Sequence, residues 1–333
     1  MATALVTGAT GLAGMHLIPR LQRDGWDVRA LVRDPARAGL LSRADVTLAT
    51  GDVLDATSFV RAARGCDVLF HAAAVITPLG GWEAFRRPNV EGTRNAIAAA
   101  ASANARLVHV SSVAVYGAHR FGSDGGRTDE SAAPGQIPVE SYYARSKRES
   151  EDLVFDAQRA GKVWATALRP AVLYGSFDRQ FVPRLARLLR HGFAPVIAGG
   201  RNTLAIVHAA NVADGLVRAA AFEGANGKAY NVANDFDVTA REFIERASEG
   251  LDRHVRIISI PMAVARVGFA IVKAVAPLVL GNRFKSMTSS SLDFLARDNP
   301  FSSDLARREL GWAPPVRPET GIPEAFRWWS AHH

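Results

Sequence analysis

The first half of the chain alternates between short apolar runs rich in β-branched residues and longer amphipathic stretches. Strand patterns lie at residues 4–7, 27–32, 46–49, 68–72, 106–111 and 163–168, with helical patterns between them at 12–23, 58–64, 91–103 and 141–160. Strands that alternate with helices predict a parallel sheet with crossover helices on its faces. We therefore expect an α/β protein with a doubly wound parallel sheet, in which ligands bind at the carboxyl ends of the strands.

The alternation becomes less regular after residue 170. Strand patterns follow at 204–207 and 228–232, and helical patterns follow at 181–191, 212–222, 240–250, 302–310 and 324–330. We expect residues 1–170 to form a nucleotide-binding domain, to which the elements near 204–232 return. Residues 171–333 then form mainly a smaller α/β substrate lobe, and the cleft between the two parts is the expected substrate site.

The composition is that of an ordinary globular protein, with 48% apolar and 22% charged residues in a chain of 333. Lys and Arg number 40 against 32 Asp and Glu, but the basic residues are dispersed, so nucleic-acid binding is not expected. The single cysteine, Cys66, excludes an intrachain disulfide and a cysteine-based zinc site, and the scattered histidines predict no metal site either. The chain runs from Met1 directly into a strand pattern without a basic leader, which predicts a cytoplasmic location.

One segment, 261–285, contains a strongly apolar stretch. Arg266 and Lys273 interrupt it, and Pro277 would bend a helix there. A spanning helix needs about 20 mostly apolar residues with few charges, so this segment does not fit one. We expect it to cover a hydrophobic pocket, with peripheral membrane contact as the alternative.

The turn after the first strand reads Thr-Gly-Ala-Thr-Gly-Leu-Ala-Gly at residues 7–14. Glycines at this spacing let the backbone turn tightly and approach a pyrophosphate, and the N-terminus of the following helix favours its negative charge. Because the turn lies directly between a strand and a helix, it predicts a Rossmann-type dinucleotide site. The residues expected to contact the cofactor here are Gly8, Thr10, Gly11, Leu12 and Gly14.

The end of the second strand indicates which dinucleotide binds. NAD sites usually place an acidic residue there, whereas this chain has Arg33, whose guanidinium could pair with a 2′-phosphate. Arg37 is a second expected contact, and Asp34 keeps NAD open as an alternative. NADP(H) is therefore the expected cofactor. The ends of the later strands add Asp52 and Val53 beside the adenine, the small residues Ala72, Ala73 and Ala74, and finally Pro170 and Val172.

The sequence Tyr-Tyr-Ala-Arg-Ser-Lys at residues 142–147 supplies the expected chemistry. Tyr143 and Lys147 are four residues apart and share one helix face. An ammonium beside a phenol favours the phenolate, so we expect Lys147 to lower the pKa of Tyr143. Tyr143 could then exchange a proton with a substrate carbonyl or carbinol while the nicotinamide exchanges hydride. Ser112, at the end of the fifth strand, could hold the same oxygen.

These motifs together resemble the extended short-chain dehydrogenases/reductases, that is, the NAD-dependent epimerase/dehydratase superfamily, along nearly the whole chain. The glycine turn, Tyr143 with Lys147, and the segments 52–53, 71–73, 89–93, 111–117, 169–170 and 308–314 fall in the order of that family. The resemblance implies that Asn89, Ser112, Tyr143 and Lys147 form the catalytic set, with Asn89 supporting the proton-relay geometry around Lys147. It also implies that a homodimer could form through the helices near 91–103 and 141–160.

Departures from the family's sugar-modifying members narrow the substrate. Val113-Ala114 replaces the Asp-Glu pair of sugar dehydratases, and Val172 and Leu204 stand where nucleotide-sugar enzymes carry Asn and Arg for the diphosphate. Residues 206–213 are instead similar to the 3β-hydroxysteroid dehydrogenase and dihydroflavonol reductase branch.

The leading hypothesis is an NADP(H)-dependent oxidoreductase that interconverts a carbonyl and a secondary alcohol on a hydrophobic sterol-, lipid- or flavonoid-like small molecule. The alternative is a nucleotide-sugar 4-epimerase or reductase using NAD(P). A third hypothesis, a non-catalytic NADP sensor on this fold, would require a broken Tyr/Lys/Ser set, and here the set is intact.

Overall fold

A computed structural model describes residues 2–39, 41, 45–76, 80–117, 126–268, 270 and 297–333. The chain divides into two compact units. Unit 1 comprises Met1–Leu173, Val207–Asp235 and Phe301–Val316, and unit 2 comprises Tyr174–Ile206, Phe236–Pro300 and Arg317–His333.

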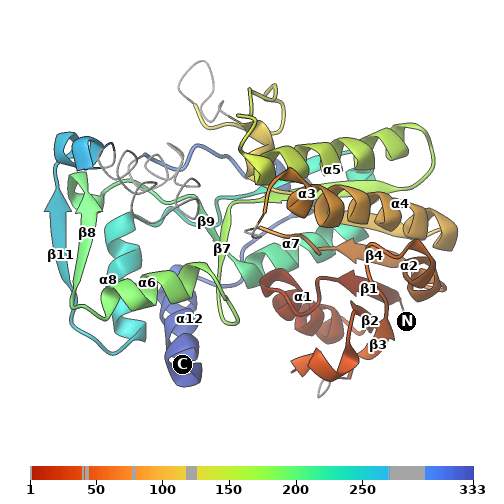
Figure 1. The fold of residues 1–333 in the computed structure, drawn as a ribbon, viewed down its shortest axis with the longest axis horizontal. Helices are drawn as coiled ribbons and strands as arrows, with labels where there is room; N and C mark the ends of the chain where they lie inside the picture. Colours follow the sequence, from red (N-terminus) through yellow and green to blue (C-terminus); the bar gives the residue numbers. More distant parts are fainter. Residues whose placement is uncertain are drawn as a thin grey trace. The chain divides into compact units, whose positions relative to one another are not determined.

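Unit 1 is built on a seven-stranded sheet in the order β10-β6-β5-β4-β1-β2-β3, in which every pair of neighbours is parallel (Figure 1). This order confirms the expected α/β class with a doubly wound sheet, because the chain starts in the interior and winds outward in both directions. The strands are β1 (Thr3–Thr7), β2 (Asp27–Val32), β3 (Thr47–Thr50), β4 (Val68–His71), β5 (Arg106–Val110), β6 (Ala165–Pro170) and β10 (Ala229–Val232).

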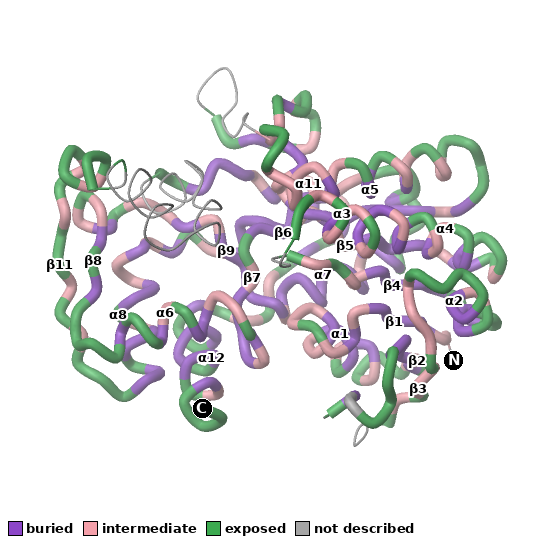
Figure 2. Tube along the Cα trace, in the orientation of Figure 1, coloured by how far each residue is buried: buried purple, intermediate pink, exposed green. Residues whose placement is uncertain are grey.

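Helices cover both faces of this sheet, and each face has its own apolar core. Successive side chains of a strand point to opposite faces, so Val6 belongs to one core and Leu5 to the other. The first core includes side chains of α1 (Leu12–Arg23) and α7 (Ala209–Ala221). The second includes side chains of α2 (Ala56–Ala63), α4 (Gly92–Ala103) and α5 (Tyr142–Arg159). Figure 2 shows the resulting burial of β1 and β4 in the middle of the sheet.

The first unit also contains shorter elements that position side chains discussed below. They are α3 (Trp82–Phe85), the π-helix η3 (Arg86–Glu91), α11 (Asp304–Leu310) and the 3₁₀ segments η1 (Pro35–Arg37), η4 (Val113–Tyr116) and η6 (Glu223–Ala225). β7 (Val172–Tyr174) pairs with β9 (Ile206–His208) in a separate two-stranded sheet.

Unit 2 has its own core of aliphatic and aromatic side chains, with Phe243 in contact with two other rings. The ring of Phe243 lies 5.4 Å from that of Tyr174 and 6.0 Å from that of Phe326. The elements of the unit are α6 (Phe181–Leu189), β8 (Phe193–Ile197), η5 (Ala198–Gly200), α8 (Ala240–Gly250), β11 (Arg256–Ile260) and α12 (Pro318–His332), with β8 and β11 paired in parallel. Residues 262–268 are helical.

The part of segment 261–285 beyond residue 270 lies outside the described residues, as do residues 118–125. Within the described ranges, no helix is both long and apolar enough to cross a membrane.

Candidate active site

The glycine turn brings the loop after β1 into backbone contact with the end of β4. Gly8 has a φ of +65°, and a Cβ there would lie 2.7 Å from the amide nitrogen of Ala73. A Cβ on Gly14 would lie 2.5 Å from the carbonyl oxygen of Gly8. Both positions require a residue without Cβ, and the positive φ of Gly8 favours glycine there as well.

The N-terminus of α1 begins directly at this turn. Its N-cap is Gly11, whose carbonyl accepts from the amide of Met15, and among the described residues no side chain caps the helix. The first N–H groups of a helix and the positive end of its dipole attract an anion. A close-packed glycine turn followed by an uncapped N-terminus therefore fits a dinucleotide pyrophosphate.

Side chains at the ends of β2 and β3 lie where the sequence predicted contacts with the rest of the cofactor. Arg33 is exposed directly after β2. The Asp34 carboxylate accepts from the amide of Ala36 at 3.0 Å and so caps η1. The side chain of Arg37 lies outside what the structure describes. Asp52 accepts from the amide of Leu54 at 2.9 Å, which fixes the turn after β3.

Ser112, Tyr143 and Lys147 lie together where β5 ends against the first turns of α5. Ser112 is the N-cap of η4, and its Oγ accepts from the amide of Ala114 at 3.2 Å. Its side chain also acts on the phenol of Tyr143, in the direction that lowers the pKa of that phenol. Lys147 is only 2% exposed, and its ammonium donates to the carbonyl of Val110 at 2.6 Å.

Burial shifts the pKa values of Tyr143 and Lys147. Burial raises the pKa of Tyr143, while the hydrogen bond from Ser112 acts in the opposite direction. The expectation that Lys147 lowers the pKa of Tyr143 below its ordinary value is therefore wrong, because the cost of desolvating a phenolate dominates. Burial also lowers the pKa of Lys147 to about 8, and Glu151 partly offsets this.

Asn89 holds the loop after β4 against α5. It lies in the π-helix η3, and its amide group both donates to and accepts from the backbone of Val75, at 2.9 and 2.7 Å. Its Nδ2 also donates to the Oγ of Ser146 at 2.9 Å, and Ser146 donates to the carbonyl of Tyr143. The contacts of the Asn89 side chain are thus with the residue before Lys147 and with the Val75 backbone.

A buried ion pair, to which no role was assigned from the sequence, links α5 to β6. Arg169 in β6 donates to the carboxylate of Glu151, with its Nε 3.1 Å from each oxygen, and to the hydroxyl of Tyr116 at 2.8 Å. Tyr116 in turn donates to Asn231 at 2.9 Å. Glu151 follows Lys147 by one helical turn, and this i,i+4 spacing was the signal that could have revealed the link.

The remaining residues predicted to contact the cofactor or a diphosphate differ in their exposure to solvent. Ala72, Ala73 and Ala74 follow β4 and are at least partly accessible, Pro170 is buried at the end of β6, and Val172 is 38% exposed on β7. Leu204, in contrast, is 5% exposed within the core of unit 2. Neither Val172 nor Leu204 offers a charge or a hydrogen-bond donor to a diphosphate.

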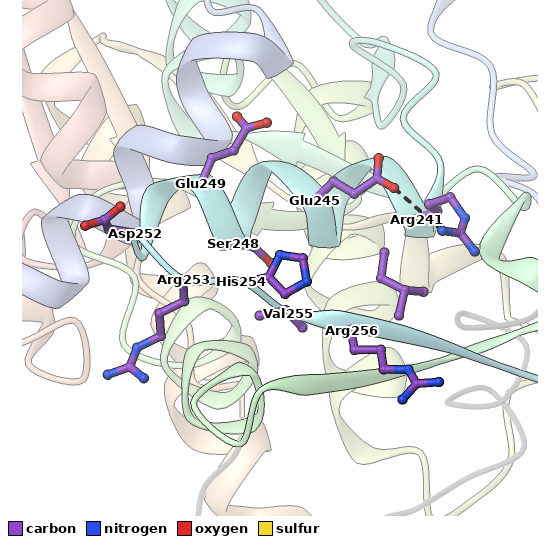
Figure 3. Close-up of a pocket in the computed structure, with 10 residues that line it drawn as sticks. Arg241, Glu245, Ser248, Glu249, Asp252, Arg253, His254, Val255 and Arg256 are labelled. Atoms are coloured by element: carbon purple, nitrogen blue, oxygen red, sulfur yellow. Dashed lines mark ion pairs between the residues drawn. The ribbon is translucent and has the colours of Figure 1, made fainter.

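A surface hollow of about 650 Å³ in unit 2 lies between the end of α8 and β11 (Figure 3). Its lining carries charges of both signs, and Arg241 pairs there with Glu245 at 3.6 Å. It contains none of the predicted site residues.

The fold and the glycine turn define a nicotinamide-dependent oxidoreductase. Residues 4–233 match the NAD dependent epimerase/dehydratase family, and the chain belongs to that family. The expected membership of the extended short-chain dehydrogenases/reductases is thereby confirmed, and the chain is an NAD(P)-dependent oxidoreductase.

Individual relatives place the chain on the 3β-hydroxysteroid dehydrogenase-like branch. A 4-hydroxy-2-methyl-3-oxo-4-farnesyl-3,4-dihydroquinoline-1-oxide ketoreductase of Stigmatella aurantiaca is 31% identical, over 95% of this chain and 93% of the relative. A 2-alkyl-3-oxoalkanoate reductase of Stenotrophomonas maltophilia is 31% identical over 96% of both chains. A 3beta-hydroxysteroid-dehydrogenase/decarboxylase of Arabidopsis thaliana is 30% identical, over 96% of this chain and 60% of the relative. The crystal structure of gox2253 superposes with a TM-score of 0.81 at 25% identity, covering 100% of this chain and 99% of that one.

Proposed function

We propose that the protein is an NADP(H)-dependent oxidoreductase that interconverts a carbonyl and a secondary alcohol on a hydrophobic small molecule. The observation that carries the proposal is the meeting of three side chains at the end of β5. The ammonium of Lys147 is buried there against the carbonyl of Val110, and Ser112 lies close enough to Tyr143 to act on the pKa of its phenol. A proton donor, a second hydroxyl and a cation on rigid elements are what a ketone needs while hydride reaches its carbon.

The roles of the residues follow from their positions. In the reducing direction Tyr143 donates its phenolic proton to the substrate oxygen, and Ser112 donates a hydrogen bond to that same oxygen. A raised pKa keeps the phenol protonated at neutral pH, as a general acid requires. Lys147 stabilises the phenolate that remains, and Asn89 holds the helical turn that carries both residues. The bound cofactor supplies or accepts the hydride.

The glycine turn and the ends of the strands would hold that cofactor. In this proposal the pyrophosphate lies against Gly8, Thr10, Gly11, Leu12 and Gly14. The adenosine half lies near Asp52 and Val53, and the nicotinamide half lies near Ala72–Ala74, Tyr143, Lys147, Pro170 and Val172. Arg33 and Arg37 are assigned to the 2′-phosphate, since a guanidinium pairs well with phosphate.

The proposed substrate class is sterol-, lipid- or flavonoid-like. Its support is twofold. Two relatives that match over nearly their full length are named for a farnesylated ketone and for 2-alkyl-3-oxoalkanoates, and the side chains of Val172 and Leu204 provide no diphosphate partner. A cytoplasmic location, and a homodimer through α4 and α5, stay predictions.

Titration of the purified protein with NADPH and NADH tests the cofactor, and turnover of a 2-alkyl-3-oxoalkanoate, a 3-oxosteroid and UDP-glucose tests the substrate. We expect exchangeable NADPH that binds more tightly than NADH, and oxidation of NADPH by the first two compounds only. An Arg33→Ala variant should weaken NADPH but not NADH. Retained NAD with turnover of UDP-glucose would instead establish the alternative, a nucleotide-sugar 4-epimerase or reductase.

A further inference from the structure

A row of buried polar side chains crosses the sheet behind the proposed site. Thr7 on β1 pairs in register with His71 on β4, and His71 pairs with His109 on β5. All three are at most 1% exposed, and the two imidazole rings stack with their centres 5.6 Å apart. Burying a polar group costs folding free energy unless the group is hydrogen-bonded. The hydrogen-bond partners of these three side chains therefore indicate their structural role.

The hydrogen bonds around His71 fix where its proton lies. The hydroxyl of Thr93 donates to the carbonyl of Asn89 at 2.6 Å, so toward His71 Nε2, at 3.2 Å, it can only accept. Nε2 therefore carries the proton. A neutral imidazole then accepts at Nδ1, here from the hydroxyl of Thr7 at 2.9 Å, and that hydroxyl accepts from the amide of Ala73 at 3.2 Å.

The surroundings keep this imidazole neutral. The groups that face His71 are Thr7 from β1, Thr93 from α4, His109 from β5 and Phe59 from α2, and the ammonium of Lys147 acts on it from α5. Burial, followed by the positive charge of Lys147, lowers the pKa of His71 to about 3.

The two ends of the hydrogen-bonded chain lie in different parts of the site. Thr7 precedes Gly8, whose backbone packs against Ala72 and Ala73. At the other end, Asn89 binds Ser146, which neighbours Lys147 on α5. His71 is the side chain that connects the cofactor turn with the segment that holds the catalytic helix.

We propose that His71 is a positioning residue, which, as the neutral Nε2–H tautomer, sets the place of the cofactor turn relative to Asn89 and α5. This inference rests on the proposed function for its catalytic readout. Cofactor binding is measured without a substrate, with NADPH or with NADH if the unaltered protein binds NADH more tightly.

His109 provides a matched control. It is as buried as His71 and shares the same ring stack, and burial likewise lowers its pKa well below the ordinary value. Its Nε2 lies 3.4 Å from the hydroxyl of Ser150, and its Nδ1 has no hydrogen-bond partner among the described residues. The Ser150 hydroxyl donates to the carbonyl of Lys147 on α5, so the hydrogen bonds of His109 do not lead to the glycine turn.

The experiment compares His71→Phe with His109→Phe. Both changes keep a ring in the stack and remove two nitrogens. We expect His71→Phe to raise the Kd of NADPH by about tenfold, equivalent to about 1.4 kcal/mol, and to lower kcat without changing the KM of the carbonyl substrate. His71→Gln, which keeps a donor and an acceptor, should recover part of the affinity. His109→Phe should change the Kd by less than about twofold, even if both variants lose similar thermal stability.

Two further measurements keep the test decisive if His71→Phe does not fold. Thr93→Val should also weaken NADPH binding, because it leaves the Nε2–H of His71 without an acceptor. Nitrogen-15 NMR of the unaltered protein should show His71 protonated at Nε2 only, with no titration between about pH 5 and about pH 8.

An Nδ1–H tautomer, or equal loss of NADPH affinity in the two Phe variants, would overturn the positioning role. If the protein turned over nucleotide sugars and no ketone, the proposed function would fail while the Kd comparison still decided the role of His71.

Discussion

The guanidinium of Arg169 binds the carboxylate of Glu151 one helical turn beyond Lys147. The Arg169 and Glu151 side chains are 13% and 6% exposed, so this ion pair is nearly buried. Glu151 raises the pKa of Lys147 and so counters the effect of burial. The pair thus contributes both to the stability of α5 and to the charge of the proposed catalytic lysine.

Glu151→Gln should therefore change stability and pH dependence together. Removing one partner of a buried ion pair leaves the other charge uncompensated, which costs about 3–5 kcal/mol of unfolding free energy by urea denaturation. Without Glu151 the pKa of Lys147 falls further below about 8, so Lys147 loses its proton at lower pH. The alkaline fall of kcat/KM should then begin at lower pH than in the unaltered protein. Glu149→Gln, an exposed change on the same helix, should alter neither quantity.

Tyr143→Phe should remove the proton donor and leave the cofactor site intact. We expect kcat to fall by about 10²- to 10⁴-fold, the usual contribution of general acid–base catalysis, with little change in the Kd of NADPH. The control is Tyr142→Phe, which keeps the ring contacts with Trp82 and Phe85. Turnover near the unaltered rate in Tyr143→Phe would show that another group supplies the proton.

His208 should make the fold sensitive to acid. Burial, with a smaller effect from His16, lowers its pKa to about 3 from an ordinary value near 6.5. The unfolded chain therefore binds a proton that the folded chain does not, and stability falls as the pH drops through 6.5 toward 3. The loss from this group between pH 6.5 and about pH 5 is about 1.6 kcal/mol.

The variant His208→Asn tests whether protonation of His208 causes this loss of stability in acid. His208 caps α7 by accepting from the amide of Ala210, and Asn is a favourable N-cap that can accept the same bond. Denaturation curves should therefore show the variant gaining on the unaltered protein as the pH falls. A constant difference across this range would mean that His208 is charged in the folded state.

Comparing Gly8→Ala with Gly25→Ala distinguishes the effect of backbone strain on NADPH affinity from the effect of a clash with the loop after β4. Both glycines have positive φ, +65° and +76°, so alanine is strained at each by a similar amount. At Gly25 an added Cβ meets nothing within 4 Å, whereas at Gly8 it meets the backbone of Ala72 and Ala73. NADPH affinity, measured by fluorescence titration, should fall at least about tenfold in Gly8→Ala only. Equal affinities in the two variants would mean that the cofactor does not use this turn.

Periodicity predicted the sheet domain well, because its elements are strongly patterned. The predicted bounds of β2 and α1 agree with the structure, and those of the other early elements differ by a few residues. β8 and β11 were missed. Pro195 interrupts β8, and both strands are half exposed, so neither shows a buried apolar run.

The sequence predicted which residues form the candidate site, but not their pKa shifts or their hydrogen-bond partners. Tyr143, Lys147 and Ser112 follow from spacing and strand ends, and the structure brings them together. The sign of the pKa shift of Tyr143 could not be read from the sequence, because it depends on burial set by distant segments. The same holds for Glu151 with Arg169, 18 residues apart, and for Thr7 with His71, 64 apart. Such pairs become visible only once the strands are aligned.

The π-helical turn around Asn89 has a consequence for how this segment can vary in length. Residues 82–103 form one continuous helical run, in which α3 and α4 flank the wider turn of η3. A π-turn is equivalent to one extra residue in an α-helix, and each residue advances an α-helix by about 100°. Deleting a single residue from 86–88 would let the run become regular, with better backbone hydrogen bonds. It would also turn Trp82 and Phe85 by about 100° away from Tyr142. The π-turn thus makes the helix less regular, but it lets α3 face Tyr142 while α4 packs on the sheet. A one-residue deletion should therefore destabilise the protein more here than in an exposed loop.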